Sequence, residues 1–233
     1  MHSSPSQRSP WQGGLEFILI AIAGVMLASL GERVLVAIAR APAGWPIPVA
    51  LVPVALGLAV GVLSADFTSG ALHWFCDRFF RKDTPLLGRL LIQPFRDHHV
   101  DPQGIVRHGL LELHGNSCIP VIAFLAVARW ADLPDPRNPG SLLVHVWIFV
   151  FASSALLTNQ FHLWAHAGKV PPGVRWLQRQ GLILTPARHA VHHRGGFSQS
   201  YCMTTGWLNP LLDRIEFFPR IERGIRGLAR WRR

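Results

Sequence analysis

Charged residues are scarce in this 233-residue chain: they make up 15% of it, whereas 49% of the residues are hydrophobic. That balance is too apolar for an ordinary soluble domain. Lysine is nearly missing, because Lys82 and Lys169 are the only two and arginine supplies the rest of the basic charge. The formal net charge of +10 favours an anionic partner. No nucleic-acid-binding motif accompanies the charge, so we expect lipid head groups and no nucleic acid.

Cysteine is also rare, with Cys76, Cys118 and Cys202 and no C-x-x-C pair. An odd number without that spacing argues against a disulfide framework and a zinc finger. The H-E-x-x-H motif is missing, which removes the usual general base of a metalloprotease. The N-terminus lacks the layout of a cleaved signal peptide. No cytochrome b5-like, flavin or ferredoxin motif is present, so electrons for any redox reaction would come from a separate protein.

The sequence does contain several long hydrophobic runs. Because a span needs about 20 apolar residues, we predict an all-α integral membrane protein with about four transmembrane helices, at 15–39, 47–65, 116–130 and 141–161. Residues 1–12 are predicted to be disordered, and residues 13–233 to form a single membrane domain. Arginines gather after the second and fourth spans, whereas the loop after the third contains Asp132 and Asp135. The positive-inside rule then predicts that both termini and a His-rich helical cap are cytoplasmic.

Histidine is the abundant functional residue, with twelve in the chain. On a helix, His189, His192 and His193 lie at i, i+3 and i+4 and share one face. In the predicted topology, separate stretches bring nine histidines to one depth at the cytoplasmic side: His73, His98, His99, His108, His162, His166, His189, His192 and His193. Neutral imidazole is a natural metal ligand, and nine exceed what one tetrahedral zinc uses. The pattern favours two metal ions, and ligand type alone admits iron, zinc, copper or nickel.

Three histidines do not join this set so easily. His2 lies in the polar N-terminus, and His145 lies about 25 Å from His162 at 1.5 Å per residue along the fourth span. His145 is therefore expected to serve packing or to lie at the membrane interface, while the role of His114 stays open. Two irons beside a bilayer would indicate oxygen activation and attack on an unactivated C–H bond, since acid–base side chains cannot supply that chemistry.

Several stretches between about residues 60 and 218 resemble the CarF-type lipid desaturases. They are Asp66…Gly70-Ala71-Leu72-His73-Trp74…Asp77, Phe95-Arg96-Asp97-His98-His99-Val100-Asp101-Pro102, Arg107-His108…Glu112, Thr158-Asn159-Gln160-Phe161-His162-Leu163-Trp164-Ala165-His166, His189…His192-His193 and Thr204-Thr205-Gly206-Trp207-Leu208-Asn209. A plant plastid desaturase acting on acyl chains of phosphatidylglycerol is similar in the same segments. The best-known reaction of the family converts the alkyl ether chain of plasmanylethanolamine to a vinyl ether, which gives a plasmalogen.

The resemblance implies an O2-dependent lipid desaturase with two iron ions, a membrane phospholipid substrate and a cytochrome b5- or ferredoxin-like electron donor. It implies that the nine histidines are the catalytic metal-site residues, with Asp77 and Asn159 beside them. The chain departs from the family at His114, where an Asn is expected, and at Phe197, where the animal enzymes carry a histidine. These departures leave open an acyl desaturase or hydroxylase. A non-catalytic membrane metal-binding protein is the alternative from another class.

Overall fold

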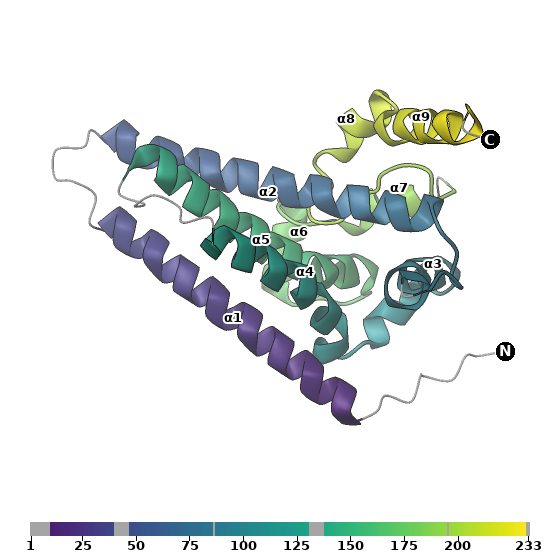
Figure 1. Cartoon of the computed structure of the whole chain (residues 1–233), viewed down its shortest axis with the longest axis horizontal. Helices are drawn as coiled ribbons and strands as arrows, with labels where there is room; N and C mark the ends of the chain where they lie inside the picture. The colour runs from purple at the N-terminus through teal and green to yellow at the C-terminus, as the bar shows by residue number, and fades with distance from the viewer. Residues whose placement is uncertain (1–9, 40–46, 86, 131–137, 195, 232–233) are drawn as a thin grey trace. The chain divides into compact units, whose positions relative to one another are not determined.

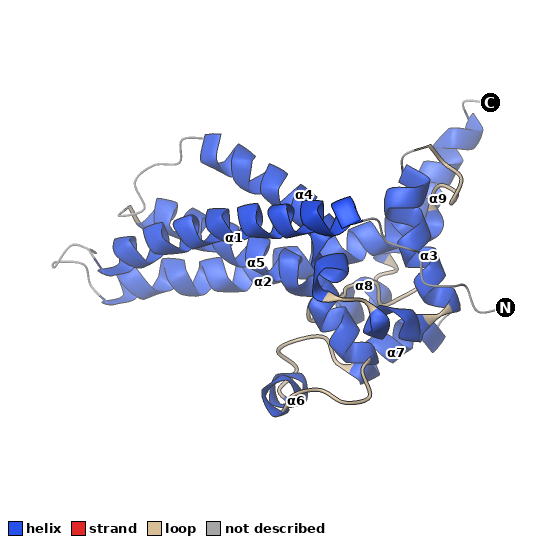
Figure 2. Cartoon of the chain, turned by 90° about the horizontal axis from the view of Figure 1, so that it is seen from below, coloured by secondary structure: helices blue, strands red, loops and turns tan. Residues whose placement is uncertain are grey.

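The computed structural model describes residues 10–39, 47–85, 87–130, 138–194 and 196–231, and every regular element within them is helical (Figure 2). The four long helices are α1 (Pro10–Ala39), α2 (Ile47–Arg78), α4 (Leu110–Trp130) and α5 (Pro139–His166) (Figure 1). Each contains a stretch long and apolar enough to cross a membrane. The predicted all-α architecture with four membrane helices is therefore confirmed, and the four apolar helices fit a membrane protein.

The helix ends differ from the predicted spans. α1 begins at Pro10, inside the stretch 1–12 predicted to be disordered, and proline is well suited to a first helical position; residues 1–9 lie outside the described residues. α2 continues past the predicted span end at residue 65 to Arg78, and the Asp66 side chain just beyond that end is fully buried. α4 likewise begins six residues before the predicted residue 116, and α5 continues past 161 to His166.

The chain forms two compact units, residues 1–61 with 108–156 and residues 62–107 with 157–233, so α2 and α5 each contribute to both. In the first unit, α1 packs on α4. Gly57 and Gly61 let α2 approach α5 closely, since an added Cβ would lie 2.8 Å and 2.7 Å from the Cβ atoms of Val146 and Val150. Such small residues four apart are typical of packed membrane helices.

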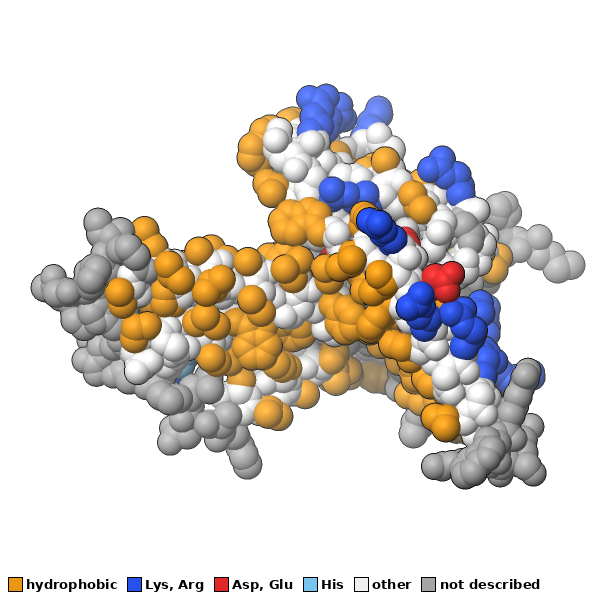
Figure 3. Space-filling model, turned by 90° about the horizontal axis from the view of Figure 1, so that it is seen from above, with side chains coloured by type: hydrophobic (Ala, Val, Ile, Leu, Met, Phe, Trp, Pro, Cys, Tyr) orange, Lys and Arg blue, Asp and Glu red, His pale blue; other side chains and the backbone are white. Residues whose placement is uncertain are grey.

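Many large apolar side chains of the long helices point outward. Phe17 and Val25 of α1 and Leu51 of α2 are each at least 60% exposed, and Figure 3 shows hydrophobic side chains covering the visible surface of the long helices. In water such a surface would be costly, but lipid chains are an apolar solvent. The exposed surface of these helices is therefore suited to a bilayer.

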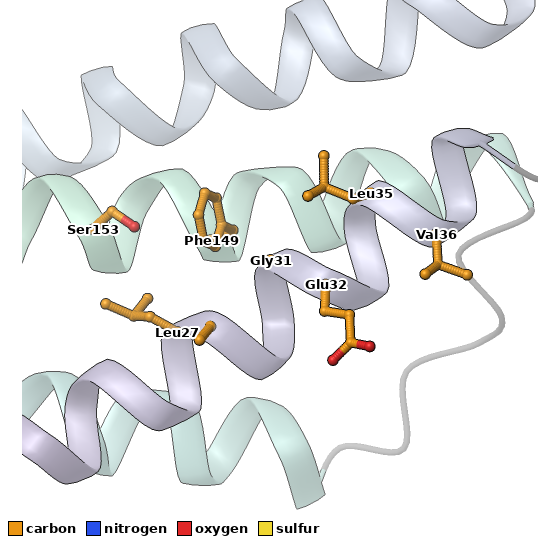
Figure 4. A pocket seen from close by; sticks show the side chains of 8 residues that line it. Leu27, Gly31, Glu32, Leu35, Val36, Phe149 and Ser153 are labelled. Atoms are coloured by element: carbon orange, nitrogen blue, oxygen red, sulfur yellow. The ribbon is translucent and has the colours of Figure 1, made fainter.

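An open groove of about 460 Å³ runs between α1 and α5 in the first unit (Figure 4). Leu27, Gly31, Leu35 and Phe149 are among its apolar lining residues, and Glu32 supplies its one carboxylate. In the structure this carboxylate belongs to a surface that is otherwise nearly apolar.

The second unit contains the shorter helices. These are α3 (Gln93–Val100), α6 (Pro172–Arg179), α7 (Pro186–Arg194), α8 (Asn209–Arg214) and α9 (Phe217–Trp231), with a π-helical turn at Gly88–Ile92 and a 3-10 turn at Pro102–Arg107. Its main core cluster consists of Trp74, Tyr201, Cys202, Leu212 and Phe218. This core ties the end of α2 to the loop before α8 and to the first turn of α9. It thereby fixes the end of α2, which carries His73.

Candidate metal centre

Four helices of the second unit bring their polar side chains together. The i, i+4 spacing places each pair on α2 and α5 on one helical face, whereas α3 and α7 each carry two consecutive histidines. The contributions are His73 and Asp77 from α2, His98 and His99 from α3, His162 and His166 from α5, and His189, His192 and His193 from α7. These nine side chains form two groups, each with ligand atoms within 4.8 Å of one another.

The first group, which we call the five-histidine group, consists of His98, His162, His166, His189 and His193. His189 Nε2 lies 2.6 Å from His166 Nε2 and 2.9 Å from the Nε2 atoms of His162 and His193. His98 Nε2 lies 3.1 Å from His162 Nε2 and 3.2 Å from His193 Nε2. A neutral imidazole has a single N–H, so hydrogen bonds alone cannot satisfy a nitrogen with three nitrogen neighbours.

The second group, which we call the Asp77 group, consists of His73, Asp77, His99 and His192. Asp77 Oδ2 lies 3.3 Å from His73 Nε2 and 3.6 Å from the Nε2 atoms of His99 and His192. Both carboxylate oxygens of Asp77 are buried, and neither accepts a hydrogen bond from the described residues. A buried carboxylate in that state is costly unless a cation sits beside it.

The two consecutive histidine pairs connect the groups. Successive side chains on a helix point about 100° apart, so neighbours in sequence cannot face the same point. Accordingly, His98 belongs to the five-histidine group and His99 to the Asp77 group, and His193 and His192 divide in the same way. The rings of His99 and His193 have their centroids 5.9 Å apart, so the groups are adjacent.

The donor atoms of both groups fit transition-metal ions. A metal–nitrogen distance of about 2.1 Å puts ligand atoms about 3.0–3.4 Å apart, depending on the coordination geometry. The Nε2 atoms of His98 and His162, and those of His99 and His192, are 3.1 Å apart. Five imidazoles in one group, and three imidazoles with a carboxylate in the other, are nitrogen-rich sets suited to such metals. The unsatisfied oxygens of Asp77 supply the charge that a cation would meet. The site is therefore compatible with two metal ions.

Burial keeps these histidines neutral. It is the largest cause that lowers the pKa of His98 to about 2, of His99 to about 3 and of His192 to about 4, and neighbouring histidines add to the effect. The pKa of His189 is also well below its usual value for the same reasons. Neutral rings have free lone pairs at physiological pH, as metal binding requires.

Two sequence-predicted site residues lie outside both groups. The Nδ1 atom of His108 lies 2.7 Å from Glu112 Oε1, and its side chain is partly exposed. Asn159 lies three residues before His162 on α5 and is half-buried. The structure thus brings eight of the nine predicted histidines together with Asp77, while His108 and Asn159 stay predictions.

The residues that depart from the family pattern have defined surroundings. The ring of Phe197 stacks on His99 with centroids 3.9 Å apart, from a backbone with φ of +57°, which is rare for a bulky residue. His114 Nδ1 lies 3.2 Å from the carbonyl of Leu156, within the first unit. His145 is buried and its Nδ1 lies 2.8 Å from the carbonyl of Ser141, which agrees with the packing role expected for it.

The sequence analysis underestimated the role of Asp77, because it placed this residue beside the metal site and not among the ligands. The structure places the Asp77 carboxylate among the candidate ligand atoms. The spacing His73-x-x-x-Asp77, one helical turn, was the signal that could have indicated this. The backbone carbonyls of Gln199 and Tyr201 also contact the Nδ1 atoms of His192 and His73. These contacts had no signal in the sequence, because every residue carries a carbonyl.

Apolar helices joined to a buried, histidine-rich site define a membrane protein with a potential metal centre. The chain belongs to the lipid desaturase domain family, whose model matches residues 62–232. No solved structure matches the chain.

Named relatives agree with this family. The chain is 39% identical over 166 residues to the plasmanylethanolamine desaturase of Myxococcus xanthus, covering 71% of this chain and 58% of the relative. It is 37% identical over 181 residues to plasmanylethanolamine desaturase 1 of Mus musculus, covering 76% and 66%. It is 34% identical over 182 residues to the chloroplastic fatty acid desaturase 4 of Arabidopsis thaliana, covering 77% and 53%. The chain thus spans about half to two thirds of the length of these relatives.

Proposed function

We propose that this protein is a membrane di-iron lipid desaturase that converts the alkyl ether chain of plasmanylethanolamine to a vinyl ether. The observation that carries the proposal is the pair of adjacent ligand groups, in a chain 39% and 37% identical to two plasmanylethanolamine desaturases. The five-histidine group would hold one iron ion and the Asp77 group the other. His108 and Asn159 are proposed to lie at the edge of this centre.

The reaction needs an oxidant and an external reductant. Two hydrogen atoms leave adjacent carbons of the chain, and O2 takes up these hydrogens, two electrons and two protons to give two water molecules. The iron ions would supply the oxygen activation that protein side chains cannot. The chain's own residues hold the ligand nitrogens neutral and bury them, as the low pKa values of His98 and His192 indicate.

The proposed location of the centre is the cytoplasmic side of the membrane. Arginines after the predicted second and fourth spans support this orientation through the positive-inside rule. A phospholipid there keeps its head group at the interface while its chain reaches toward the site. The electrons are proposed to come from a separate cytochrome b5- or ferredoxin-like protein, and the basic surface favours an acidic carrier.

The decisive experiment is to express the chain in a host that makes saturated ether lipids but no plasmalogens, and to analyse the lipids of that host. We expect new ether lipids, two hydrogens lighter, that release an aldehyde on acid treatment, because vinyl ethers are acid-labile. The matched control is His192→Ala, which removes a fully buried candidate ligand and should abolish the product. Iron-loaded protein that alters no lipid with any electron donor would contradict the proposal.

A second candidate is a desaturase or hydroxylase of fatty-acyl chains on a glycerolipid, which the 34% identity to a chloroplastic fatty acid desaturase favours. In the same host, its product would be an acyl alkene or alcohol that releases no aldehyde in acid. A non-catalytic metal-binding protein would be identified by reversible binding of a single metal ion and unchanged lipids. Metal stoichiometry and lipid analysis together therefore separate the three functions.

A further inference from the structure

The segment between α7 and α8 lies directly against α2 in the second unit. We call residues 199–208 the strap. The α2 residues that hold it are Asp66, Ser69, Gly70 and His73, which share one helical face at i, i+3, i+4 and i+7. These residues and the end of the strap include parts of the family-like sequence to which no role has yet been assigned.

Asp66 binds the strap most extensively. Its Oδ1 accepts hydrogen bonds from the backbone N–H groups of Thr205 at 2.7 Å and Gly206 at 2.9 Å, and its Oδ2 accepts one from Leu208 at 3.1 Å. The side chain is fully buried. A charged acceptor forms strong hydrogen bonds with N–H donors, and a buried charge in an apolar helix is retained only where such partners compensate it.

Neighbouring contacts bring the strap close to the helix. Ser69 Oγ accepts a hydrogen bond from the backbone N–H of Met203 at 2.9 Å. At Gly70, an added Cβ would lie 2.6 Å from Cys202 Sγ and 3.2 Å from Cys202 N, so only glycine permits this approach. Asn209 binds both backbone groups of Cys202, at 2.8 Å and 3.1 Å. The strap is therefore held against α2 by hydrogen bonds and by a close approach that leaves no room for a larger residue at Gly70.

The strap in turn orients two ligands of one group. The carbonyl of Gln199 lies 2.7 Å from His192 Nδ1, and that of Tyr201 lies 3.3 Å from His73 Nδ1. A carbonyl at Nδ1 holds the proton there and leaves Nε2 free to bind a metal. In the five-histidine group, by contrast, the Nδ1 atoms of His98 and His189 have no hydrogen-bond partner among the described residues. The strap carbonyls therefore contact ligand rings of the Asp77 group, while the side chain of Thr204 and the carbonyl of Thr205 anchor the strap to α5 and α7 through Thr158 and Arg188.

We propose that Asp66 is a positioning residue that sets the metal affinity of the Asp77 group by holding the strap in place. This inference rests on the proposed two-metal site. Loss of a partner behind a metal-binding histidine weakens metal binding about 10–100-fold. Disturbing the strap should therefore weaken one metal site by that factor and leave the other intact.

In the test, Co²⁺ is titrated into the metal-free protein in detergent and the visible absorption is measured. The absorption spectrum of bound Co²⁺ depends on the ligand set of each ion. We expect two ions in the wild type. In Asp66→Asn, whose amide group presents N–H donors to the strap, one site should weaken about 10–100-fold. The absorption that is lost should match that lost in Asp77→Asn. The control Asp83→Asn removes the same charge from a side chain that is 72% exposed, and should leave both sites unchanged.

A second variant disturbs the strap and leaves the Asp66 side chain unchanged. Gly70→Ala should displace Cys202 and cause the same selective weakening, whereas the control Gly173→Ala, which meets no atom within 4 Å, should not. If the wild type binds fewer than two ions, the proposed function fails. If the wild type binds two and the Asp66 and Gly70 variants keep both sites, or weaken both equally, the positioning role is overturned.

Discussion

At the scale of single residues, Asp77 is the side chain whose role changes most between sequence and structure. Its carboxylate is buried among three imidazole nitrogens, and neither oxygen accepts a hydrogen bond from the described residues. Without a cation, a carboxylate in this position takes up a proton, because a buried charge without a partner is too costly to keep. With a cation bound, the same charge becomes the strongest attraction in the Asp77 group. The residue therefore links stability to metal content.

Asp77→Asn should consequently have two effects of opposite sign. At alkaline pH, where the carboxylate of the metal-free protein ionises, it should raise the free energy of unfolding by about 1–3 kcal/mol, because an unpaired buried charge is removed. In the presence of metal it should reduce the stabilisation that the metal gives. Thermal unfolding in detergent, with and without chelator, measures both. A variant that is less stable than the wild type after chelation at alkaline pH would contradict this explanation.

The neutral histidines predict a pH dependence for the metal-free protein. The pKa values of His98, His99 and His192 are about 2, 3 and 4 in the folded chain, against about 6.5 when unfolded. Between these values the unfolded chain binds more protons than the folded chain, so the free energy of unfolding rises with pH. The stability that the neutral histidines contribute is lost as the pH falls below about 6.5. Chelated protein should therefore unfold at a lower temperature at pH 5 than at pH 7.5, and equal temperatures would disprove this.

At the scale of elements, the sequence predicted helices well and their ends less well. Apolar runs identified the four long helices, because a lipid-facing helix leaves a long uninterrupted pattern. The predicted second span covers only the apolar part of α2, 47–65, whereas the helix continues through the polar stretch to Arg78. Only the folded chain supplies the backbone donors that satisfy the buried Asp66 carboxylate. The helical spacing of His162 with His166, by contrast, was readable in the sequence and is preserved in the site.

The helix α9 is joined to the end of α2 by its first turns. Phe218 is 3% exposed, and its ring lies 5.4 Å from that of Trp74 and 5.3 Å from that of Tyr201. Arg78 forms two hydrogen bonds with Glu222, at 2.8 Å and 3.0 Å. Because Tyr201 belongs to the strap, the packing of α9 also supports the segment behind the Asp77 group.

Phe218→Ala should therefore destabilise the protein by about 3–5 kcal/mol, the usual cost of removing a buried aromatic ring. The matched control is Leu228→Ala on the same helix, at a side chain that is 64% exposed, where we expect a change within about 0.5 kcal/mol. Thermal unfolding in detergent gives both values. Equal losses for the two variants would mean that α9 is not held by its first turn.

At the scale of the whole molecule, the proposed orientation can be tested without knowing the substrate. Alkaline phosphatase is active only outside the bacterial cytoplasm, so its fusion after Asp135, in the predicted outer loop, should be active. Fusions at Met1 and Arg233 should be inactive, and green fluorescent protein fusions at these termini should fluoresce. Phosphatase activity at the C-terminus would place the histidine-rich unit on the other side.

The division of neighbouring histidines between the two groups constrains how such a centre can vary. His98 with His99, and His192 with His193, tie both ion positions to the same two short helices. A slip of either helix by one residue would put one histidine in the place of the other and bring a neighbouring residue, such as Asp97 or Val191, to the place that is vacated. Both ion positions would then change together, so one cannot drift while the other is preserved. Diversification of this scaffold would then be confined to the surroundings of the ion pair, and new substrates would be accommodated by the residues that touch the lipid.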